Sequence, residues 1–451
     1  MKLWSIAAPL VCVLLVACGG GGGDVSSDSG DVGGNADNTP VDPNVLPRND
    51  IKQLSDLYPY VRDSQYASVL KRCALANSAA ESCALGTLPF IGQSNPQVEI
   101  DAIMQRVLVT HDWMGERFEA LLYDAPNEMI ELFASVTVIS MGSTVRPSFY
   151  STLTAAIQLD PAFIWLTQAE KANISIADDY RVDFGRDLGF WEMRSARLEG
   201  ARASPYYSLT SRLDRTYDEM KLRAYTLLFH ELGHAVDYVN PQYMSLVNSN
   251  DTPSQAIESL VAYRGSLELL SVSPLTSIEM EYLGLVQFRG YEATEQQKTY
   301  TPSQVGGFMS SDGAAKYYSY HTEREDFANL LELSMMKKHF NVDLYTGFAS
   351  KPLDDTNYGC DELIVGWGQR NRLSDPLVWP RAKWVVENVY GLIDENTRFF
   401  DLQIDKQSAM TPGVDWCTNR DNDRDGIASR ASTQVRDSVG QLNAERRQRL
   451  H

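Results

Sequence analysis

The clearest pattern of apolar and polar positions along the chain runs from Tyr217 to Val239. Apolar side chains recur there at intervals of three and four residues, the spacing of one face of a helix. Thr216 and Glu219 form a capping box in front of this run, and Asn240-Pro241 follows it. The sequence therefore predicts a largely buried helix that begins near residue 217 and ends near residue 239.

The remaining pattern predicts further helices and a small sheet. Residues 48–125 are expected to be mainly helical, with the best helical pattern from Ile100 to Leu122 and a short helix after it at 128–133. The capping-box pattern Thr252-Pro253-Ser254-Gln255 predicts a helix that runs to about residue 270. Residues 275–315 are polar and are expected to be irregular.

Two strands are expected between these helical regions. Val136-Thr137-Val138-Ile139-Ser140 is typical of a strand, and 149–159 predicts a second one, which Asp160-Pro161 ends. Together the elements predict an α+β protein that is mostly helical and carries a small mixed sheet.

The N-terminus has the composition of a targeting segment. Lys2 precedes the apolar run Leu3 to Val16, which is shorter than the roughly 20 residues that a membrane span needs. Leu15-Val16-Ala17-Cys18 resembles a bacterial lipobox, so we expect 1–17 to be a lipoprotein signal peptide and Cys18 to be lipidated. A secretory signal without lipid is the alternative.

Further expectations on location follow from the residues after the lipobox. Gly19 follows the cysteine where an inner-membrane retention signal would have an acidic residue, so we expect an outer-membrane lipoprotein that faces the periplasm or the cell surface. Residues 18–46 are rich in Gly, Ser, Asp and Asn and predict a flexible acidic tether.

Four cysteines remain after removal of the signal peptide and lipidation of Cys18. These are Cys73, Cys83, Cys360 and Cys417. An even number in an oxidising compartment predicts disulfides, and four cysteines allow three connectivities. We favour a local bridge from Cys73 to Cys83 and a second bridge from Cys360 to Cys417; free buried thiols are the alternative.

Length and charge limit the partners and the organisation. The chain has 451 residues, 43% of them hydrophobic, and a formal net charge of −19, which argues against nucleic acid and against an anionic membrane surface. We expect contact with a membrane through the lipid anchor only. After the tether we expect an N-terminal helical region with strands at 47–210, a core at 211–400 and a C-terminal segment at 401–451.

The helix at 217–239 carries the sequence His230-Glu231-x-x-His234. Residues four apart lie on one helix face, so both imidazoles can bind one zinc ion, each at about 2.1 Å. Glu231 lies roughly 100° round the helix, where it can act as general base toward a water at the metal. A chance occurrence of this pattern is the alternative, but the buried helix around it favours a metal site.

A catalytic zinc usually has a third protein ligand. No histidine follows His234 at the short spacing of the metzincins, so the third ligand is expected to be a carboxylate from a later helix. The best region is Tyr318 to Asn329. Thr322-x-x-Glu325 is also a capping-box pattern, and Glu323 and Asp326 are alternative ligands.

Two segments together resemble the anthrax lethal factor and Pro-Pro endopeptidase group of zinc metallopeptidases. They are His230-Glu231-x-Gly233-His234-Ala235-Val236-Asp237 and Tyr318-x-x-x-x-Glu323-x-Glu325-x-Phe327-Ala328. The resemblance covers about 217–340 and implies a zincin-like fold, Glu325 as third ligand and Tyr318 as the group that steadies the oxyanion. Tyr317 and Tyr320 compete for that role, and His321 is a possible second donor.

The chain departs from this group at two points. The group usually has glutamate where this chain has Asn329, and the two ligand-bearing helices are separated by an insertion, since 325 − 234 = 91 residues. The substrate preference of the group therefore does not transfer to this chain.

Two further features are expected around the metal. Asp237 shares the face of the histidines and can accept a ring N–H from one of them; a solvated aspartate is the alternative. In metallopeptidases with this signature an edge strand beside the site pairs with an extended substrate, and Ala155 to Leu159 is the candidate, with a buried core strand as the alternative.

The C-terminal segment holds the first half of a calcium loop. Asp421, Asp423 and Asp425 alternate and Gly426 follows, but Ser432 stands where an EF-hand has its bidentate glutamate. A calcium half-loop or an acidic surface loop is expected.

The sequence as a whole predicts a zinc-dependent endopeptidase that acts on a protein or peptide substrate, with Glu231 as general base. The alternative is a binding or adhesion lipoprotein whose zinc site is structural or inactive.

Overall fold

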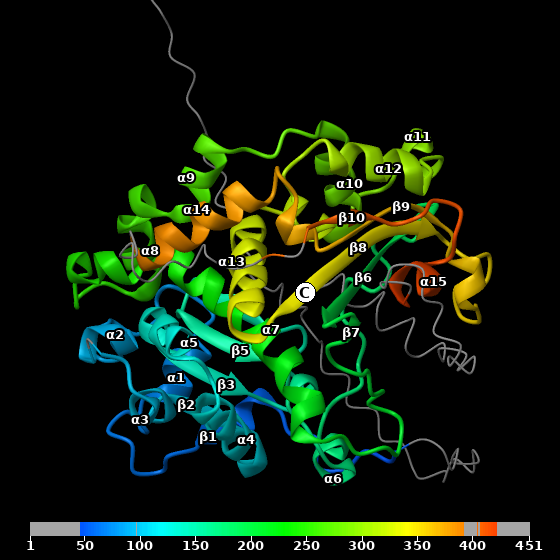
Figure 1. The fold of residues 1–451 in the computed structure, drawn as a ribbon. Coiled ribbons are helices and arrows are strands. Elements are labelled where there is room, and N and C mark those ends of the chain that lie inside the picture. The colour runs from blue at the N-terminus through cyan, green and yellow to red at the C-terminus, as the bar shows by residue number, and fades with distance from the viewer. Residues whose placement is uncertain (1–45, 96, 392–403, 405, 422–451) are drawn as a thin grey trace, which may run out of the picture. The chain divides into compact units, whose positions relative to one another are not determined.

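The computed structural model describes residues 46–95, 97–391, 404 and 406–421, all of which belong to one compact unit of the chain. The signal peptide, Cys18, the tether up to residue 45, Asp423 and Asp425 lie outside the described residues. The described part is a mixed α and β structure, as expected, but it contains two five-stranded sheets where one was predicted (Figure 1). None of the described helices combines the length and the apolar composition that crossing a membrane requires.

The first sheet is mixed. Its strands, in spatial order, are β1 (Tyr58–Pro59), β2 (Val107–Val109), β3 (Val138–Met141), β5 (Ala156–Leu159) and β4 (Phe149–Ser151). The three central strands β2, β3 and β5 are parallel and fully buried, while the strands at both edges run antiparallel. Strand β3 confirms the prediction made for 136–140.

The predicted long helix over Ile100 to Leu122 is wrong. The structure has helix α3 (Ile100–Met104), strand β2 and helix α4 (Asp112–Tyr123) in its place. Val107, Leu108 and Val109 are buried on both sides of the sheet, and such a short apolar run cannot be told from a buried helical segment by its periodicity.

The single strand predicted at 149–159 is two strands joined by a turn. Ala155 lies in the turn with a positive φ of 52°, and its N–H donates to the carbonyl of Ser151. Strand β5 lies between β3 and β4, so the expectation that Ala155 to Leu159 forms an edge strand is wrong and the core-strand alternative holds.

The second sheet is antiparallel, and its strands were not predicted. In spatial order they are β10 (Ser408–Ala409), β9 (Val365–Arg370), β8 (Val342–Ser350), β6 (Phe190–Leu198) and β7 (Ala201–Arg202). The pair β6 and β8 is the longest, with Phe190 opposite Ser350 at one end and Leu198 opposite Val342 at the other.

Helices α7 (Tyr217–Tyr238) and α13 (Glu323–Phe340) pack against each other between the two sheets (Figure 1). The capping box of Thr216 and Glu219 starts α7, as predicted. The two helices approach closely at Gly233, where an added Cβ would lie 3.1 Å from the Cα of Ala328. A larger residue at Gly233 would push apart the helices that carry the candidate ligands.

The insertion between α7 and α13 is more helical than predicted. The expected helix at 252–270 is α8 (Pro253–Ser259) and α9 (Gly265–Val272), and the segment 275–315 contains helices α10 (Ile278–Arg289), α11 (Glu295–Lys298) and α12 (Pro302–Ser310). Thr294 and Thr301 each form a capping box with the glutamine three residues later. The prediction of irregular structure considered the polar composition of the segment and missed these two caps.

Six other α-helices lie in the described part. They are α1 (Leu70–Ala74), α2 (Ile91–Ser94), α5 (Asn127–Leu132), α6 (Gln168–Ala172), α14 (Trp379–Tyr390) and α15 (Trp416–Asp421). Helix α5 confirms the short helix predicted at 128–133.

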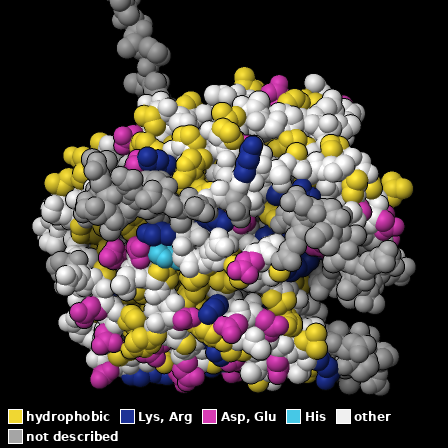
Figure 2. Space-filling view, in the orientation of Figure 1, with side chains coloured by type: hydrophobic (Ala, Val, Ile, Leu, Met, Phe, Trp, Pro, Cys, Tyr) yellow, Lys and Arg dark blue, Asp and Glu magenta, His cyan; other side chains and the backbone are white. Residues whose placement is uncertain are grey.

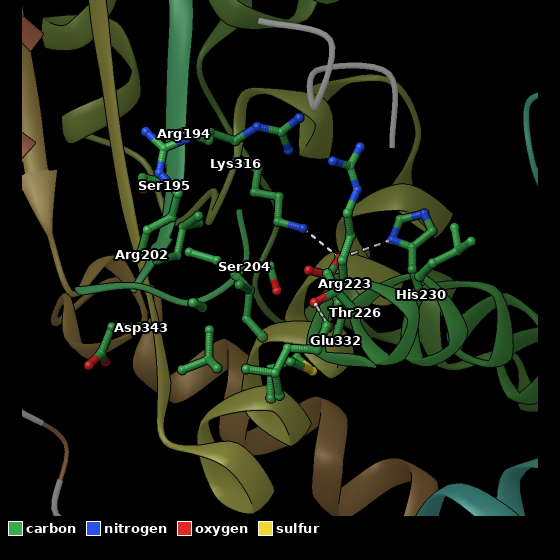
Figure 3. Close-up of a pocket in the computed structure, with 18 of the residues that line it drawn as sticks. Arg194, Ser195, Arg202, Ser204, Arg223, Thr226, His230, Lys316, Glu332 and Asp343 are labelled. Carbon is green, nitrogen blue, oxygen red and sulfur yellow. Dashed lines mark hydrogen bonds and ion pairs between the residues drawn. The ribbon is translucent and has the colours of Figure 1, made fainter. Parts of the chain in front are cut away.

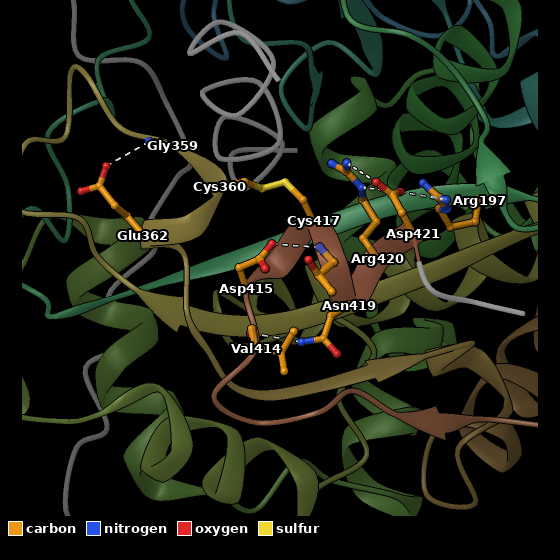
Figure 4. The surroundings of a disulfide bond; sticks show 11 residues. Arg197, Gly359, Cys360, Glu362, Val414, Asp415, Cys417, Asn419, Arg420 and Asp421 are labelled. Atoms are coloured by element: carbon orange, nitrogen blue, oxygen red, sulfur yellow. Dashed lines mark hydrogen bonds and ion pairs between the residues drawn. A yellow bond between two sulfur atoms is a disulfide. The ribbon is translucent and has the colours of Figure 1, made fainter. Parts of the chain in front are cut away.

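The cysteines come together in the connectivity that we favoured. Cys73 and Cys83 form one disulfide, and Cys360 and Cys417 form the other, with Cα atoms 5.3 and 5.9 Å apart. The second bridge ties α15 to the segment before β9 (Figure 4).

Candidate active site

Helices α7 and α13 bring three potential metal ligands together. The Nε2 atoms of His230 and His234 lie 3.1 and 3.2 Å from the same carboxylate oxygen of Glu325. The two rings stand at 88° to each other with centroids 4.9 Å apart, so both nitrogens converge without stacking. Ligand atoms of all three residues lie within 4.8 Å of one another.

This donor set fits a zinc ion. Two imidazole nitrogens and one carboxylate oxygen are a usual catalytic zinc set, and ligands about 2.1 Å from a tetrahedral centre lie roughly 3.4 Å apart. The observed separations of 3.1 and 3.2 Å between Glu325 and the two histidines are close to that spacing. Little movement would be needed for the three side chains to hold such an ion.

The three acids that could provide the third ligand lie in the first turn of α13 and have different partners. Thr322 caps the helix by accepting the backbone N–H of Glu325, but the Glu325 side chain does not return to the cap and points at the histidines instead. Asp326 is bonded to Arg381, and Glu323 pairs with Arg324. Only Glu325 of these three acids reaches both histidines.

Electrostatics link these ligands tightly. Burial would lower the pKa of His230, but its hydrogen bonds with Glu325 and Glu332 raise it to about 9. Burial would raise the pKa of Glu325, yet His234 and His230 hold the pKa of that carboxyl well below its usual range. In the absence of a metal, a proton on His230 balances the Glu325 carboxylate.

Glu231 is a buried acid beside the three candidate ligands, and it lacks a complete set of hydrogen-bond partners among the described residues. It is 2% exposed, and its Oε2 atom has no hydrogen-bond partner among the described residues. Burial raises the pKa of Glu231, while the two histidines act in the opposite direction. A buried, unpaired carboxylate oxygen is costly to a fold, and such atoms in native structures call for a functional explanation.

Of the three neighbouring tyrosines, Tyr318 reaches the site. Its hydroxyl donates to the Oε1 atom of Glu325 at 3.0 Å. Tyr320 donates instead to Asp312, and the Tyr317 ring packs against Phe190, Phe288 and Phe348. His321 stacks on Tyr318, and its Nδ1 atom lies 3.6 Å from Glu325.

Glu332 and Lys316 contribute to the site and were missed from the sequence. The Nδ1 atom of His230 lies 3.3 Å from Glu332, which Lys316 also contacts closely. Glu332 follows Glu325 by seven residues, two helical turns, so its position on the same face of α13 was a usable signal. Its carboxylate can fix the tautomer of His230, the role that outer-shell acids serve at metal sites.

Asp237 does not make the contact that was expected of it. Its Oδ1 atom accepts the backbone N–H of Ser266 at 2.6 Å, and no hydrogen bond joins it to either histidine within the described part of the chain. Burial raises its pKa to about 6. Glu332 occupies the place beside His230 that was predicted for Asp237.

The described end of the predicted calcium half-loop is occupied by arginines. Asp421 accepts hydrogen bonds from Arg197 at 3.3 Å and from Arg420 at 2.9 and 2.8 Å (Figure 4). Two guanidinium groups around this carboxylate oppose a cation there. Asp423 and Asp425 lie outside the described residues, so the calcium prediction stays a prediction.

Comparison of the chain with family models, with curated proteins and with solved structures finds no significant match. The argument for function therefore depends on the site itself.

Proposed function

We propose that this protein is a zinc-dependent endopeptidase with a zincin-like catalytic core, in which His230, His234 and Glu325 hold the metal. The observation that carries the proposal is the unpaired, buried Oε2 atom of Glu231 beside three converging ligand atoms. A purely structural zinc site has no use for a further buried carboxylate that is not a ligand.

A zinc ion bound by these residues would supply Lewis acidity, which polarises a peptide carbonyl and brings the pKa of water to about 7. Glu231 takes the proton of the attacking water and passes it to the leaving amine. Its raised pKa suits both directions of that transfer, because the carboxyl can hold the proton between the two steps. Burial keeps competing bulk water away from it.

Tyr318 is placed to stabilise the negative charge that develops on the carbonyl oxygen. Its hydroxyl lies at Glu325, next to the ligand set, and its pKa is raised well above the usual value by burial and by Glu325. The phenol therefore remains a donor at all working pH values and can turn from Glu325 to the oxyanion.

The location of the enzyme follows from the N-terminal sequence. We propose that the protein is exported and held to the outer membrane by a lipid on Cys18, with a protein or peptide as its substrate. Lipid labelling and membrane fractionation of the unmodified protein and of Cys18→Ser would test the anchor. The variant should lose both the label and the membrane association.

The experiment that tests the proposed activity combines metal analysis with cleavage of an unbiased peptide library. Purified protein should contain about one zinc per chain and should lose cleavage with a chelator and regain it with zinc. Glu231→Gln should keep the zinc but lose activity by roughly 10²–10⁴-fold, the range for a general base.

A matched control is Glu323→Gln. This residue is a neighbouring glutamate that pairs with Arg324 and is not among the three residues whose ligand atoms converge. Its activity should be unchanged. Cleavage that survives both the chelator and Glu231→Gln would reject the proposed mechanism.

A further inference from the structure

A cavity lies beside the candidate metal site, on the side of His230 that faces Glu332 (Figure 3). It measures about 130 Å³ and is bounded by α7, α13 and strands β6, β7 and β8. The His230 ring is a common wall, with its Nε2 atom toward Glu325 and its Nδ1 atom toward Glu332 and the cavity. A group in the cavity would therefore lie next to a peptide held at the metal.

Positive charge predominates on the cavity wall. Its charged lining residues are Arg194, Arg202, Arg223, Lys316, Glu332 and Asp343. Both acids already have cationic partners, since Lys316 contacts Glu332 and Lys337 lies 2.9 Å from Asp343. This contrasts with the net charge of −19 and with the face in Figure 2, where acidic side chains lie scattered among basic ones.

Arg223 is the cation that best fits a ligand. It precedes His230 by seven residues on α7 and so lies on the same helix face, two turns away. Its guanidinium carbon is 5.0 Å from the ring centre of Phe163 and 5.6 Å from that of Tyr206. No carboxylate of the described residues lies within ion-pair distance of it.

The surroundings of Arg223 make an anion favourable. Burial lowers the pKa of Arg223, although Tyr206 and Asp160 act in the opposite direction. Asp160 is already bound by Arg146, so an added negative charge would stabilise the guanidinium. Leu222, Leu227, Leu333 and Met336 complete the wall with apolar surface. A short apolar stem that ends in a carboxylate matches this combination.

We propose that the cavity is a specificity pocket for an acidic side chain of the peptide substrate, with Arg223 as the group that binds the carboxylate. The proposal depends on the proposed peptidase function and adds a substrate class to it. Glutamate fits the cavity better than aspartate, because its longer stem spans the apolar wall before it reaches the guanidinium.

The test is a cleavage profile of the full-length, zinc-loaded protein on a peptide library, followed by a matched pair of peptides that differ only by Glu or Gln at the selected position. The wild type should prefer an acidic residue at one position flanking the cleaved bond. Arg223→Gln should lower kcat/KM for the Glu peptide by roughly 10- to 100-fold, the loss expected for one charge-assisted hydrogen bond, and leave the Gln peptide unchanged.

Arg62→Gln is the matched control, because Arg62 also lies over a tyrosine ring but is exposed and is not among the residues that line the cavity. It should keep the acidic preference. If Arg223→Gln does not fold, Arg223→Lys keeps a cation and the stem but loses the bidentate fork, and should weaken the preference without abolishing it.

The outcomes separate this proposal from the function on which it depends. Zinc-dependent cleavage without an acidic preference, or with a preference that survives Arg223→Gln, overturns the pocket and leaves the peptidase. Absence of both zinc and cleavage overturns the peptidase and the pocket with it.

Discussion

Two buried clusters of charged side chains in this protein differ in how completely their polar atoms are bonded. In the cluster around Arg372 and Arg381, every guanidinium nitrogen has an acceptor, supplied by carbonyls and by Asp375 and Asp326. In the candidate active site, Glu231 is equally buried but keeps one oxygen without a partner. Complete bonding is what a fold requires of buried charge, whereas an atom left unbonded is available for chemistry.

The contrast is sharpest at two adjacent residues of α13. Glu325 points toward the histidines of α7, and Asp326 points the other way, to Arg381. Neighbours on a helix project about 100° apart, so one turn of helix serves both clusters.

The largest expected effect comes from neutralising each of these two acids. Asp326→Asn leaves Arg381 buried without its counter-charge and should lower the free energy of unfolding by about 3 kcal/mol or more, measured by urea denaturation. Glu325→Gln should instead lose its zinc on dialysis. In the metal-free state at pH 9, its free energy of unfolding should fall by less than that of Asp326→Asn. A reversed order of stabilities would place Glu325 in the structural cluster.

Removal of the Tyr318 hydroxyl tests the catalytic side alone. Tyr318→Phe should lower kcat by about 10²–10³-fold, the range for loss of one oxyanion donor, with KM and zinc content nearly unchanged. Tyr320→Phe is the control, since its hydroxyl bonds Asp312 and not the site. A loss in KM alone would assign Tyr318 to substrate binding.

The free energy of unfolding of the metal-free protein should depend on pH through the candidate active site and not through the arginine cluster. The pKa of His230 is about 9 in the fold against an ordinary value of 6.5. Its stabilising contribution is complete below pH 6.5 and is lost as the pH rises to about 9, a change on the order of 3 kcal/mol. Urea unfolding at pH 6, 7.5 and 9 measures this, and His230→Gln should flatten the slope between these values.

The smallest expected effect distinguishes the two acids that compete for the outer shell. Glu332→Gln should weaken zinc binding by roughly 10- to 100-fold, as loss of an outer-shell partner does. Asp237→Asn should leave zinc affinity unchanged, because its carboxylate serves the backbone of Ser266. Competition with a chromophoric chelator measures both, and equal losses would remove the distinction.

Local signals explain what the sequence could predict. Helix caps and helical periodicity depend on residues that are close together in the sequence. The helices capped by Thr216 and Thr252 both begin where predicted. The ligand pair His230 and His234 needed only the geometry of a single helix. Glu325 needed a resemblance as well, since nothing local distinguishes it from Asp326.

The errors have a common physical origin in partners that are distant along the chain. Val107 to Val109 becomes a strand because β3 supplies its hydrogen bonds, and Ala155 to Leu159 lies inside the sheet because β4 folds back on it. Glu332 and Asp237 have equally suitable spacings from the ligands. Only the packing of α13 on α7 decides which of them reaches His230.

The insertion between the ligand-bearing helices has a consequence for when the site can exist. His234 and Glu325 are separated by 325 − 234 = 91 residues, so in an unfolded chain the acidic donor lies far from the two histidines and the three do not form a chelating cluster. A cation can be captured firmly only after α13 has docked on α7, and it would then act as a cross-link that closes a long loop. A polypeptide in which α7 and α13 have not yet packed together would therefore bind the cation weakly and would lack the proposed activity.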